Sequence, residues 1–215
     1  MFSPIPKSQP QAASRRKLLA AARLAKPSTA QNGRALPRAL FVTDPVRTPD
    51  ILMIARRLPR GFGIVWRHYG ADHRLATGRE LARICRQRGL ILLVSADPEL
   101  SARIGAQGVH WPEARLSGNR LKLPRFIETA SAHDPRAIAR AARLGVDAVI
   151  VSPVFPSRSP SAGKPLGVVK FRQMARAATL PVYALGGVGP RNAARAMTHA
   201  AGWAAIDSVV DGWGS

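Results

Sequence analysis

Short apolar segments alternate with helical segments along most of the chain, and this alternation constrains the fold more than any other feature. The apolar runs, such as 90–95 and 182–185, lack polar alternation and are typical of parallel strands buried on both faces. Eight such strands with intervening helices predict a compact (β/α)8 TIM barrel, an α/β fold with eight parallel strands. A doubly wound open sheet is the alternative. The predicted strands are 39–43, 63–67, 90–95, 108–111, 126–130, 147–151, 182–185 and 203–206.

Two glycines, Gly186 and Gly187, follow the seventh predicted strand. Their lack of side chains lets backbone N–H groups approach a ligand closely. Pro190 fits the first turn of a helix that we expect to run to Met197. A glycine turn that leads into a helix is a natural anion site, although the same residues also suit an ordinary strand-to-helix turn. The position of this turn on the second-to-last strand of a barrel favours a ligand site.

The formal net charge of +21 over 215 residues favours anionic partners without indicating a fold. No acidic residue precedes Asp44, whereas Lys and Arg are frequent there. We expect residues 1–35 to be a basic, disordered leader and residues 36–215 to form a single barrel domain. A transit peptide, a solvated tail and an overlong start are the alternatives for the leader.

Composition excludes several classes of protein. A single cysteine, Cys85, excludes an internal disulfide and a cysteine-rich metal site. No apolar run is long enough to span a membrane, and no secretory signal is present, so we expect a cytoplasmic protein without a membrane partner. An aromatic content of 6% and the absence of a reading motif argue against nucleic acid as a partner.

Polar residues follow most of the predicted strands, where a TIM barrel carries its chemistry. Each has a structural alternative: Arg67 as a surface cation, His110 as a core residue, and Asp97 as a helix cap. Their coincidence on one rim favours a site. The candidates are Arg67, Asp97, His110, Ser131, His133, Ser152, Ser157, Ser159, Gly186, Gly187, Ile206 and Ser208.

Between about residues 38 and 210 the chain resembles the thiamine phosphate synthase/TenI family, whose members are compact eight-stranded barrels. The sixth- and seventh-strand motifs are specific together. The resemblance is carried by LFVTD at 40–44, VWR at 65–67, AD at 96–97, IGAQGVH at 104–110, SAH at 131–133, GVDA at 145–148, SPVFPSRS at 152–159 and PVYALGGV at 181–188.

The resemblance implies a small phosphorylated thiazole as ligand. Its phosphate would lie between the turn at Gly186 and Gly187 and the backbone N–H groups of 206–208, which include Ile206 and Ser208. Asp207 falls inside this second element, and a carboxylate beside a phosphate dianion is unfavourable unless it points away. The other side chains assigned to substrate binding are Asp97, His110, Ser131, Ser152, Ser157 and Ser159.

Synthase members of the family also bind a pyrimidine diphosphate with Mg²⁺, and most residues for that task are replaced here. The Gln and Lys that flank the strand-two arginine correspond to Val65 and Tyr69. Asp97 would ligate Mg²⁺ in a synthase, but the second metal-binding acid aligns with Arg115, which reverses the charge at the ion. We therefore expect no cofactor, or Mg²⁺ if the protein is a synthase. The cations that remain as substitutes are Arg158 and Lys164.

The sister activity in the family is tautomerisation of a thiazole carboxylate phosphate, which needs proton transfer rather than a metal. The resemblance nominates His133 as the general acid/base, and we assign Arg67 beside it as catalytic. We therefore expect a tautomerase-like enzyme. The alternatives are a thiamine phosphate synthase, which joins a hydroxymethylpyrimidine diphosphate to a thiazole phosphate, and a non-catalytic thiazole phosphate-binding or regulatory protein. A homodimer is left open.

Overall fold

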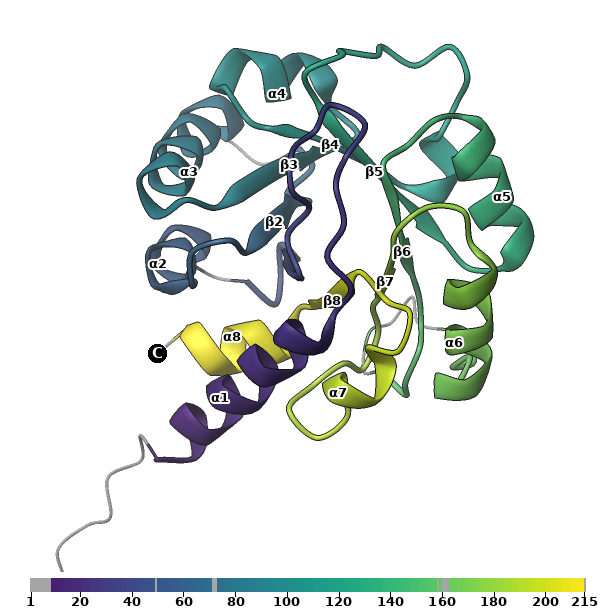
Figure 1. Cartoon of the computed structure of the whole chain (residues 1–215). Coiled ribbons are helices and arrows are strands. Elements are labelled where there is room, and N and C mark those ends of the chain that lie inside the picture. The colour runs from purple at the N-terminus through teal and green to yellow at the C-terminus, as the bar shows by residue number, and fades with distance from the viewer. Residues whose placement is uncertain (1–8, 49, 71–72, 158, 160–162, 215) are drawn as a thin grey trace, which may run out of the picture.

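The computed structural model describes residues 9–48, 50–70, 73–157, 159 and 163–214. Eight strands, each parallel to its neighbours, form a closed barrel in chain order, with β8 paired to β1 (Figure 1). This closure confirms the predicted TIM barrel and excludes the open sheet. The strands are β1 (Ala39–Val42), β2 (Gly63–Trp66), β3 (Ile91–Ser95), β4 (Gly108–Trp111), β5 (Ile127–Ala132), β6 (Ala148–Val151), β7 (Val182–Ala184) and β8 (Gly202–Ala205).

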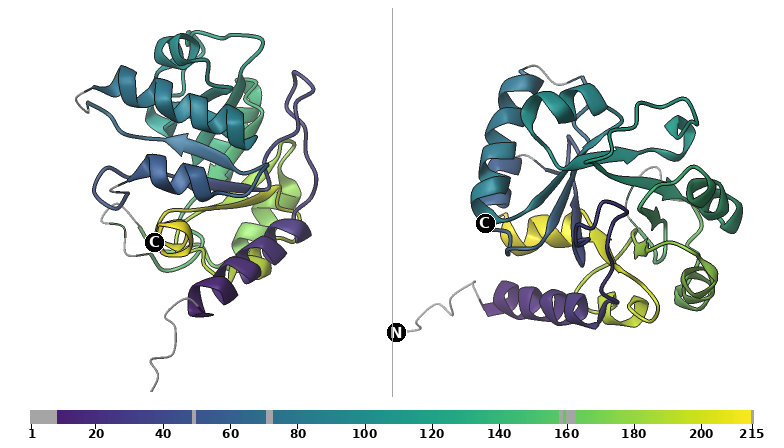
Figure 2. Two further views of the ribbon diagram at one scale, coloured as in Figure 1. Left: turned by 90° about the vertical axis from the view of Figure 1, so that its left-hand side faces the viewer. Right: turned by 45° about the horizontal axis from the view of Figure 1, so that its top comes forward.

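Helices surround the barrel, as Figures 1 and 2 show. After β4, where the sequence predicts no long helix, the described chain forms only a short 3₁₀ turn. The helices are α1 (Gln9–Leu24), α2 (Ile51–Arg57), α3 (Arg74–Arg88), α4 (Pro98–Ile104), η1 (Glu113–Arg115), α5 (Pro135–Arg143), α6 (Val168–Ala177), α7 (Ala193–Ala196) and α8 (Asp207–Trp213).

The strands are apolar on both faces because each face is buried in a different part of the core. Leu40 and Val42 of β1 point into the barrel, where they pack with Tyr183. Phe41, between them in the sequence, belongs to the layer between the strands and the helices, together with Trp203. Burial on both sides accounts for the absence of polar alternation in the sequence.

The expected disordered leader is wrong for residues 9–35. Residues 9–24 form α1, which lies beside α7 and α8 in both views of Figure 2. Leu18 and Ala21 of α1 are fully buried, and the carbonyl of Leu18 accepts a hydrogen bond of 3.2 Å from the indole N–H of Trp203. The physical reason is an apolar stripe at helical spacing beneath the basic residues, which covers the outer side of β8. Residues 1–8 of the predicted leader lie outside the described residues.

The segment after α1 is also held to the barrel. The N–H of Lys26 donates to the carbonyl of Ala200 at 2.9 Å, and the N–H of Gln31 donates to Asp147 Oδ1 at 2.7 Å. Thr29 and Ala35 form an antiparallel bridge between these anchors. Backbone contacts of this kind are absent from a mobile tail, so residues 25–35 form part of the folded structure.

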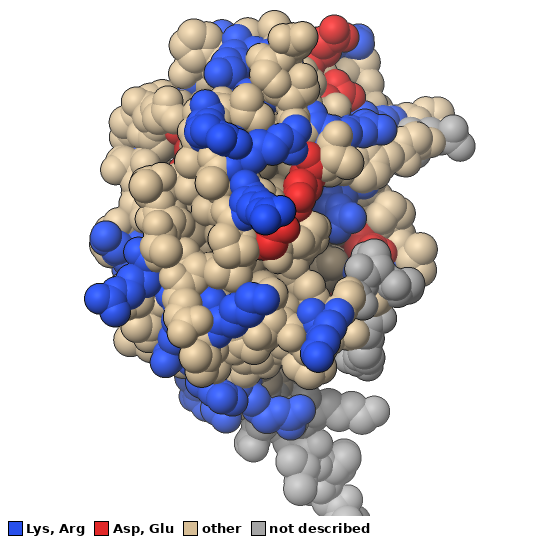
Figure 3. All heavy atoms as spheres, turned by 90° about the vertical axis from the view of Figure 1, so that its right-hand side faces the viewer, with Lys and Arg blue, Asp and Glu red and all other residues tan. Residues whose placement is uncertain are grey.

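Lys and Arg side chains are spread over the face shown in Figure 3, with few acidic residues among them. Arg136 and Arg143 of α5, and Lys170 and Arg176 of α6, are exposed. Within the described residues, no helix combines the length and the apolar character needed to cross a membrane.

Candidate active site

A cavity of about 1220 Å³ opens at the carboxyl ends of the strands. It lies where a TIM barrel carries its active site. The structure brings every predicted site residue except Asp97 to the wall of this cavity. They are Arg67, His110, Ser131, His133, Ser152, Ser157, Ser159, Gly186, Gly187, Ile206 and Ser208.

The turn after β7 is shaped by close backbone approach. Gly186 and Gly187 both have positive φ, at 89° and 62°. A Cβ on Gly187 would lie 2.2 Å from the carbonyl oxygen of Pro156 in the neighbouring loop, so this position has no room for a side chain. Among the described residues, the N–H groups of Gly187 and Val188 donate to no protein acceptor. The turn therefore offers backbone donors to a ligand in the cavity.

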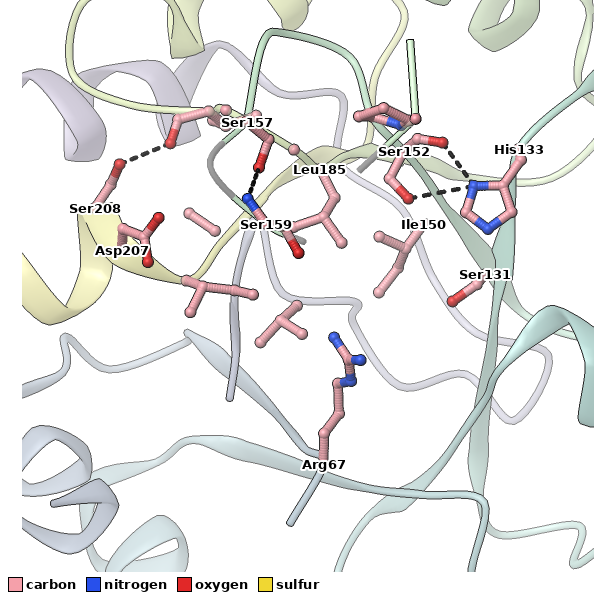
Figure 4. A pocket seen from close by; sticks show the side chains of 18 of the residues that line it. Arg67, Ser131, His133, Ile150, Ser152, Ser157, Ser159, Leu185, Asp207 and Ser208 are labelled. Carbon is pink, nitrogen blue, oxygen red and sulfur yellow. Dashed lines mark hydrogen bonds between the residues drawn. The ribbon is translucent and has the colours of Figure 1, made fainter. Parts of the chain in front are cut away.

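Asn192 and Ser208 hold this turn in place. The Asn192 side chain accepts a 2.8 Å hydrogen bond from the N–H of Gly189 and donates to the carbonyl of Gly187 at 2.9 Å. Ser208, at the start of α8, donates through its hydroxyl to the carbonyl of Val188 at 2.7 Å, as drawn in Figure 4. Because Asn192 is used in the turn, α7 begins at residue 193, later than the predicted start at Pro190. The two predicted phosphate-binding elements are thus joined directly.

His133 follows β5 and is oriented by the backbone of the next strand. Its Nδ1 lies 2.7 Å from the carbonyl oxygen of Ser152 (Figure 4). A carbonyl oxygen only accepts, so Nδ1 carries the proton in this contact, and Nε2 is the basic nitrogen of the neutral ring. Nε2 lies 3.9 Å from Glu113 Oε2, an oxygen that accepts no hydrogen bond from the described residues. This arrangement leaves a proton acceptor in the wall of the cavity.

His110 is a buried, neutral histidine at the end of β4. Its Nδ1 lies 2.9 Å from the hydroxyl of Thr129, and its Nε2 lies 3.0 Å from the hydroxyl of Ser131. Burial, with a smaller contribution from the charge of Arg67, lowers the pKa of His110 to about 3. His110 therefore stays uncharged at neutral pH and fixes the Ser131 hydroxyl beside the cavity.

Arg67 enters the cavity from β2, across from the β7 turn (Figure 4). Its own N–H donates to the hydroxyl of Thr43 at 2.9 Å, which fixes the backbone from which the side chain extends. Tyr69, two residues later, places its hydroxyl in hydrogen-bond contact with Ser95 at the end of β3. This side of the cavity therefore carries a guanidinium and two neutral hydroxyls.

Asp97 does not line the cavity. Its Oδ1 caps α4 by accepting from the N–H of Leu100 at 2.9 Å, and its Oδ2 accepts from Arg74 Nη1 at 2.6 Å. The helix cap, the structural alternative for this residue, is thus the arrangement found, because Pro98 begins the helix directly after it. The predicted role of Asp97 in substrate binding does not fit this position.

The residues present do not fit a Mg²⁺ site. A hard cation needs several free oxygen ligands, whereas both oxygens of Asp97 are occupied by protein donors. Arg115, where the second acid is expected, places its guanidinium 5.9 Å from the ring centre of Tyr69. Throughout the described part of the chain, no three His, Cys, Asp or Glu side chains come together as a metal site. Of the two substitute cations, Lys164 lines the cavity and Arg158 lies outside the described residues.

Sequence reasoning missed two charged residues of the cavity wall. Glu113 stands three residues after His110, and Arg47 stands three residues after Asp44, so each lies just beyond a strand end where candidates are expected. Neither belongs to the motifs that carry the family resemblance. The signal that identifies them is position on the rim alone.

The family model described as thiamine monophosphate synthase (TMP-TENI) matches residues 40–209. The chain belongs to this family. The matched region begins in β1 and ends in α8, so it includes the whole barrel and every strand that contributes to the cavity.

Similar proteins of the thiamine monophosphate synthase family carry related names. The thiamine-phosphate synthase of Alcanivorax borkumensis is 31% identical over 163 residues, which are 71% of this chain and 75% of that protein. That of Chromobacterium violaceum is 37% identical over 59% of this chain and 63% of its own length. The bifunctional protein ThiM/ThiE of Symbiobacterium thermophilum is 34% identical, and the match spans only 30% of its length. The chain thus spans less than two thirds of some of the family members that it matches.

Solved structures agree on the fold of the family. A thiamine phosphate pyrophosphorylase from Pyrococcus furiosus superposes with a TM-score of 0.71, covering 82% of this chain and 88% of that one. At 22% sequence identity, this likeness concerns the barrel and not the ligands.

Proposed function

We propose that this chain is an enzyme of thiamine phosphate biosynthesis that binds a phosphorylated thiazole in the cavity and moves a proton on it through His133. The observation that carries the proposal is the contact of His133 Nδ1 with the carbonyl of Ser152, which leaves Nε2 as the basic nitrogen in the wall of the same cavity. A histidine titrates near neutral pH and transfers protons in both directions.

Each part of the cavity has a role in this reaction. The N–H groups of Gly187 and Val188 would bind the phosphate, and Ser208 would hold the turn that presents them. Arg67, on the other side of the cavity, would pair with a carboxylate on the thiazole ring. His133 Nε2 would take a proton from one ring-system atom and return it to another. The reaction is an isomerisation, so atoms and charge balance without a second substrate.

A thiamine phosphate synthase is the second candidate, and the names of the relatives favour it. In that reaction Mg²⁺ would neutralise the diphosphate that leaves the pyrimidine. The occupied oxygens of Asp97 and the guanidinium of Arg115 argue against this chemistry, because charge develops on the leaving group and needs matched cations. Arg67 and Lys164 are the cations in the described cavity wall that could take over part of that task.

The two reactions separate in one assay. The protein is incubated with the thiazole carboxylate phosphate alone, and separately with hydroxymethylpyrimidine diphosphate and thiazole phosphate, each with and without Mg²⁺. Metal-independent isomerisation supports the first candidate. Mg²⁺-dependent formation of thiamine phosphate supports the second. Thiazole phosphate binding without turnover of either kind identifies a binding protein.

A further inference from the structure

Arg47 and Asp207 form an ion pair beside the predicted phosphate site. Arg47 lies in the loop between β1 and α2, and Asp207 is the first residue of α8. Arg47 Nη1 lies 3.4 Å from Asp207 Oδ1, and both residues line the cavity together with Gly187 and Ser208. The side chains are 24% and 35% exposed, so water screens the pair only in part. Arg47 therefore brings a fixed positive charge to the part of the cavity where a carboxylate would otherwise oppose a phosphate.

Arg47 is anchored by a different and tighter partner. Its Nη2 donates to Asp44 Oδ2 at 2.9 Å, and its backbone N–H donates to Asp44 Oδ1 at 3.1 Å. Hydrogen bonding from the Arg47 side chain lowers the pKa of Asp44 to about 2, so the anchoring carboxylate stays charged over the whole physiological range. The anchor persists if the contact with Asp207 is lost.

The two contacts of the guanidinium are thus unequal. At 3.4 Å the hydrogen bond to Asp207 is long, whereas the bond to Asp44 has the length of a good charge-assisted contact. A phosphate dianion carries more charge than a carboxylate and three acceptor oxygens, so it competes effectively for Arg47 Nη1. Release of Asp207 also allows this carboxylate to turn away from the dianion.

We propose that Arg47 is the phosphate-recognising cation of this cavity and that Asp207 is its exchangeable partner, released when a phosphomonoester binds. The inference rests on the proposed function, because it specifies which side chains select the phosphorylated form of the ligand. A thiazole alcohol without phosphate gains nothing from the exchange. The site therefore selects phosphomonoesters over the corresponding alcohols.

Calorimetric binding to the full chain tests this inference with three probes: thiazole phosphate, the dephosphorylated thiazole alcohol and inorganic phosphate. Arg47→Gln should raise the Kd for thiazole phosphate by about 10–100-fold, which is the value of one charge-assisted contact. Its Kd for the alcohol should not change. Asp207→Asn should lower the Kd for thiazole phosphate by about 3–10-fold, because it removes one nearby like charge.

Asp211→Asn is the matched control, since Asp211 also lines the cavity but makes no ion pair with Arg47. It should leave the Kd for thiazole phosphate within about twofold, as expected of a screened carboxylate. An unchanged Kd in Arg47→Gln, or weaker binding in Asp207→Asn, overturns the inference while the proposed function stands. Arg47-dependent binding of inorganic phosphate without binding of thiazole phosphate overturns the proposed function alone. A wild-type protein that binds neither overturns both.

Discussion

The carboxylate of Asp97 accepts a hydrogen bond of 2.6 Å from Arg74 Nη1 while its other oxygen caps α4. The guanidinium of Arg74 in turn lies 5.4 Å from the ring centre of Trp66. A residue that serves as a metal ligand in a synthase is thus part of a structural cluster in this chain. Together with Arg115, this pairing separates the cavity from the Mg²⁺ chemistry that the family resemblance implies.

Asp97→Ala should therefore act on stability. Loss of an N-cap costs about 0.5–2 kcal/mol in the free energy of unfolding, which urea denaturation measures. Asp134→Ala removes the equivalent cap of α5, where Asp134 accepts from the N–H of Ala137, and should cost a similar amount. We expect neither variant to change turnover by proton transfer. A selective loss of Mg²⁺-dependent turnover in Asp97→Ala would restore the residue as a metal ligand.

The N-terminal helix makes a second prediction, about stability. Leu18→Ala should lower the free energy of unfolding by about 2–5 kcal/mol, since Leu18 is completely buried against the barrel. Leu24→Ala, at a side chain that is 64% exposed near the end of the same helix, should change it by less than about 0.5 kcal/mol. Equal effects in the two variants would mean that α1 does not pack on the barrel in solution.

Stability should depend on pH through His110. Its pKa is lowered to about 3 in the folded protein, against about 6.5 in the unfolded chain. As the pH falls below 6.5, the unfolded chain takes up a proton that the folded protein does not, so stability falls by up to about 1.4 kcal/mol per pH unit. This loss continues down to about pH 3.

His110→Asn should remove that share of the slope between pH 6.5 and 5 in urea titrations, whereas His199→Asn, at an exposed histidine, should not. An unchanged slope in His110→Asn would mean that the buried imidazole already carries a proton in the folded state.

Gly187 supplies a prediction about the phosphate site. Gly187→Ala and Gly167→Ala both place a side chain at positive φ, so each should cost about 1–3 kcal/mol of stability. Only at Gly187 does the new Cβ meet a backbone carbonyl, whereas nothing lies within 4 Å of it at Gly167. We expect Gly187→Ala to raise the Kd for thiazole phosphate by about 10–100-fold and Gly167→Ala to leave it unchanged. Equal Kd values in the two variants would remove the β7 turn from the phosphate site.

The barrel could be predicted from the sequence because its signal is repeated eight times, and Gly186 and Gly187 report a close backbone approach through residue type alone. The helix α1 was missed because its basic residues dominate the composition, while the stripe of Leu18 and Ala21 carries the packing. Asp97 shows a different limit. A carboxylate before a Pro-initiated helix suits a cap and a ligand equally well, and only the position of Arg74 decides between them. Ion pairs between distant segments, such as Arg47 with Asp207, have no local signature.

The central claim is that His133 moves a proton on a phosphorylated thiazole held in this cavity, and the rate and affinity of one variant test it most directly. His133→Asn should lower the rate of thiazole carboxylate isomerisation by about 10²–10⁴-fold, which is the contribution of a positioned general acid/base. Since His133 does not belong to the phosphate-binding turn, the Kd for thiazole phosphate should stay within a few-fold of wild type. Wild-type turnover that is retained in His133→Asn, or binding without any turnover in the wild-type protein, would contradict the account.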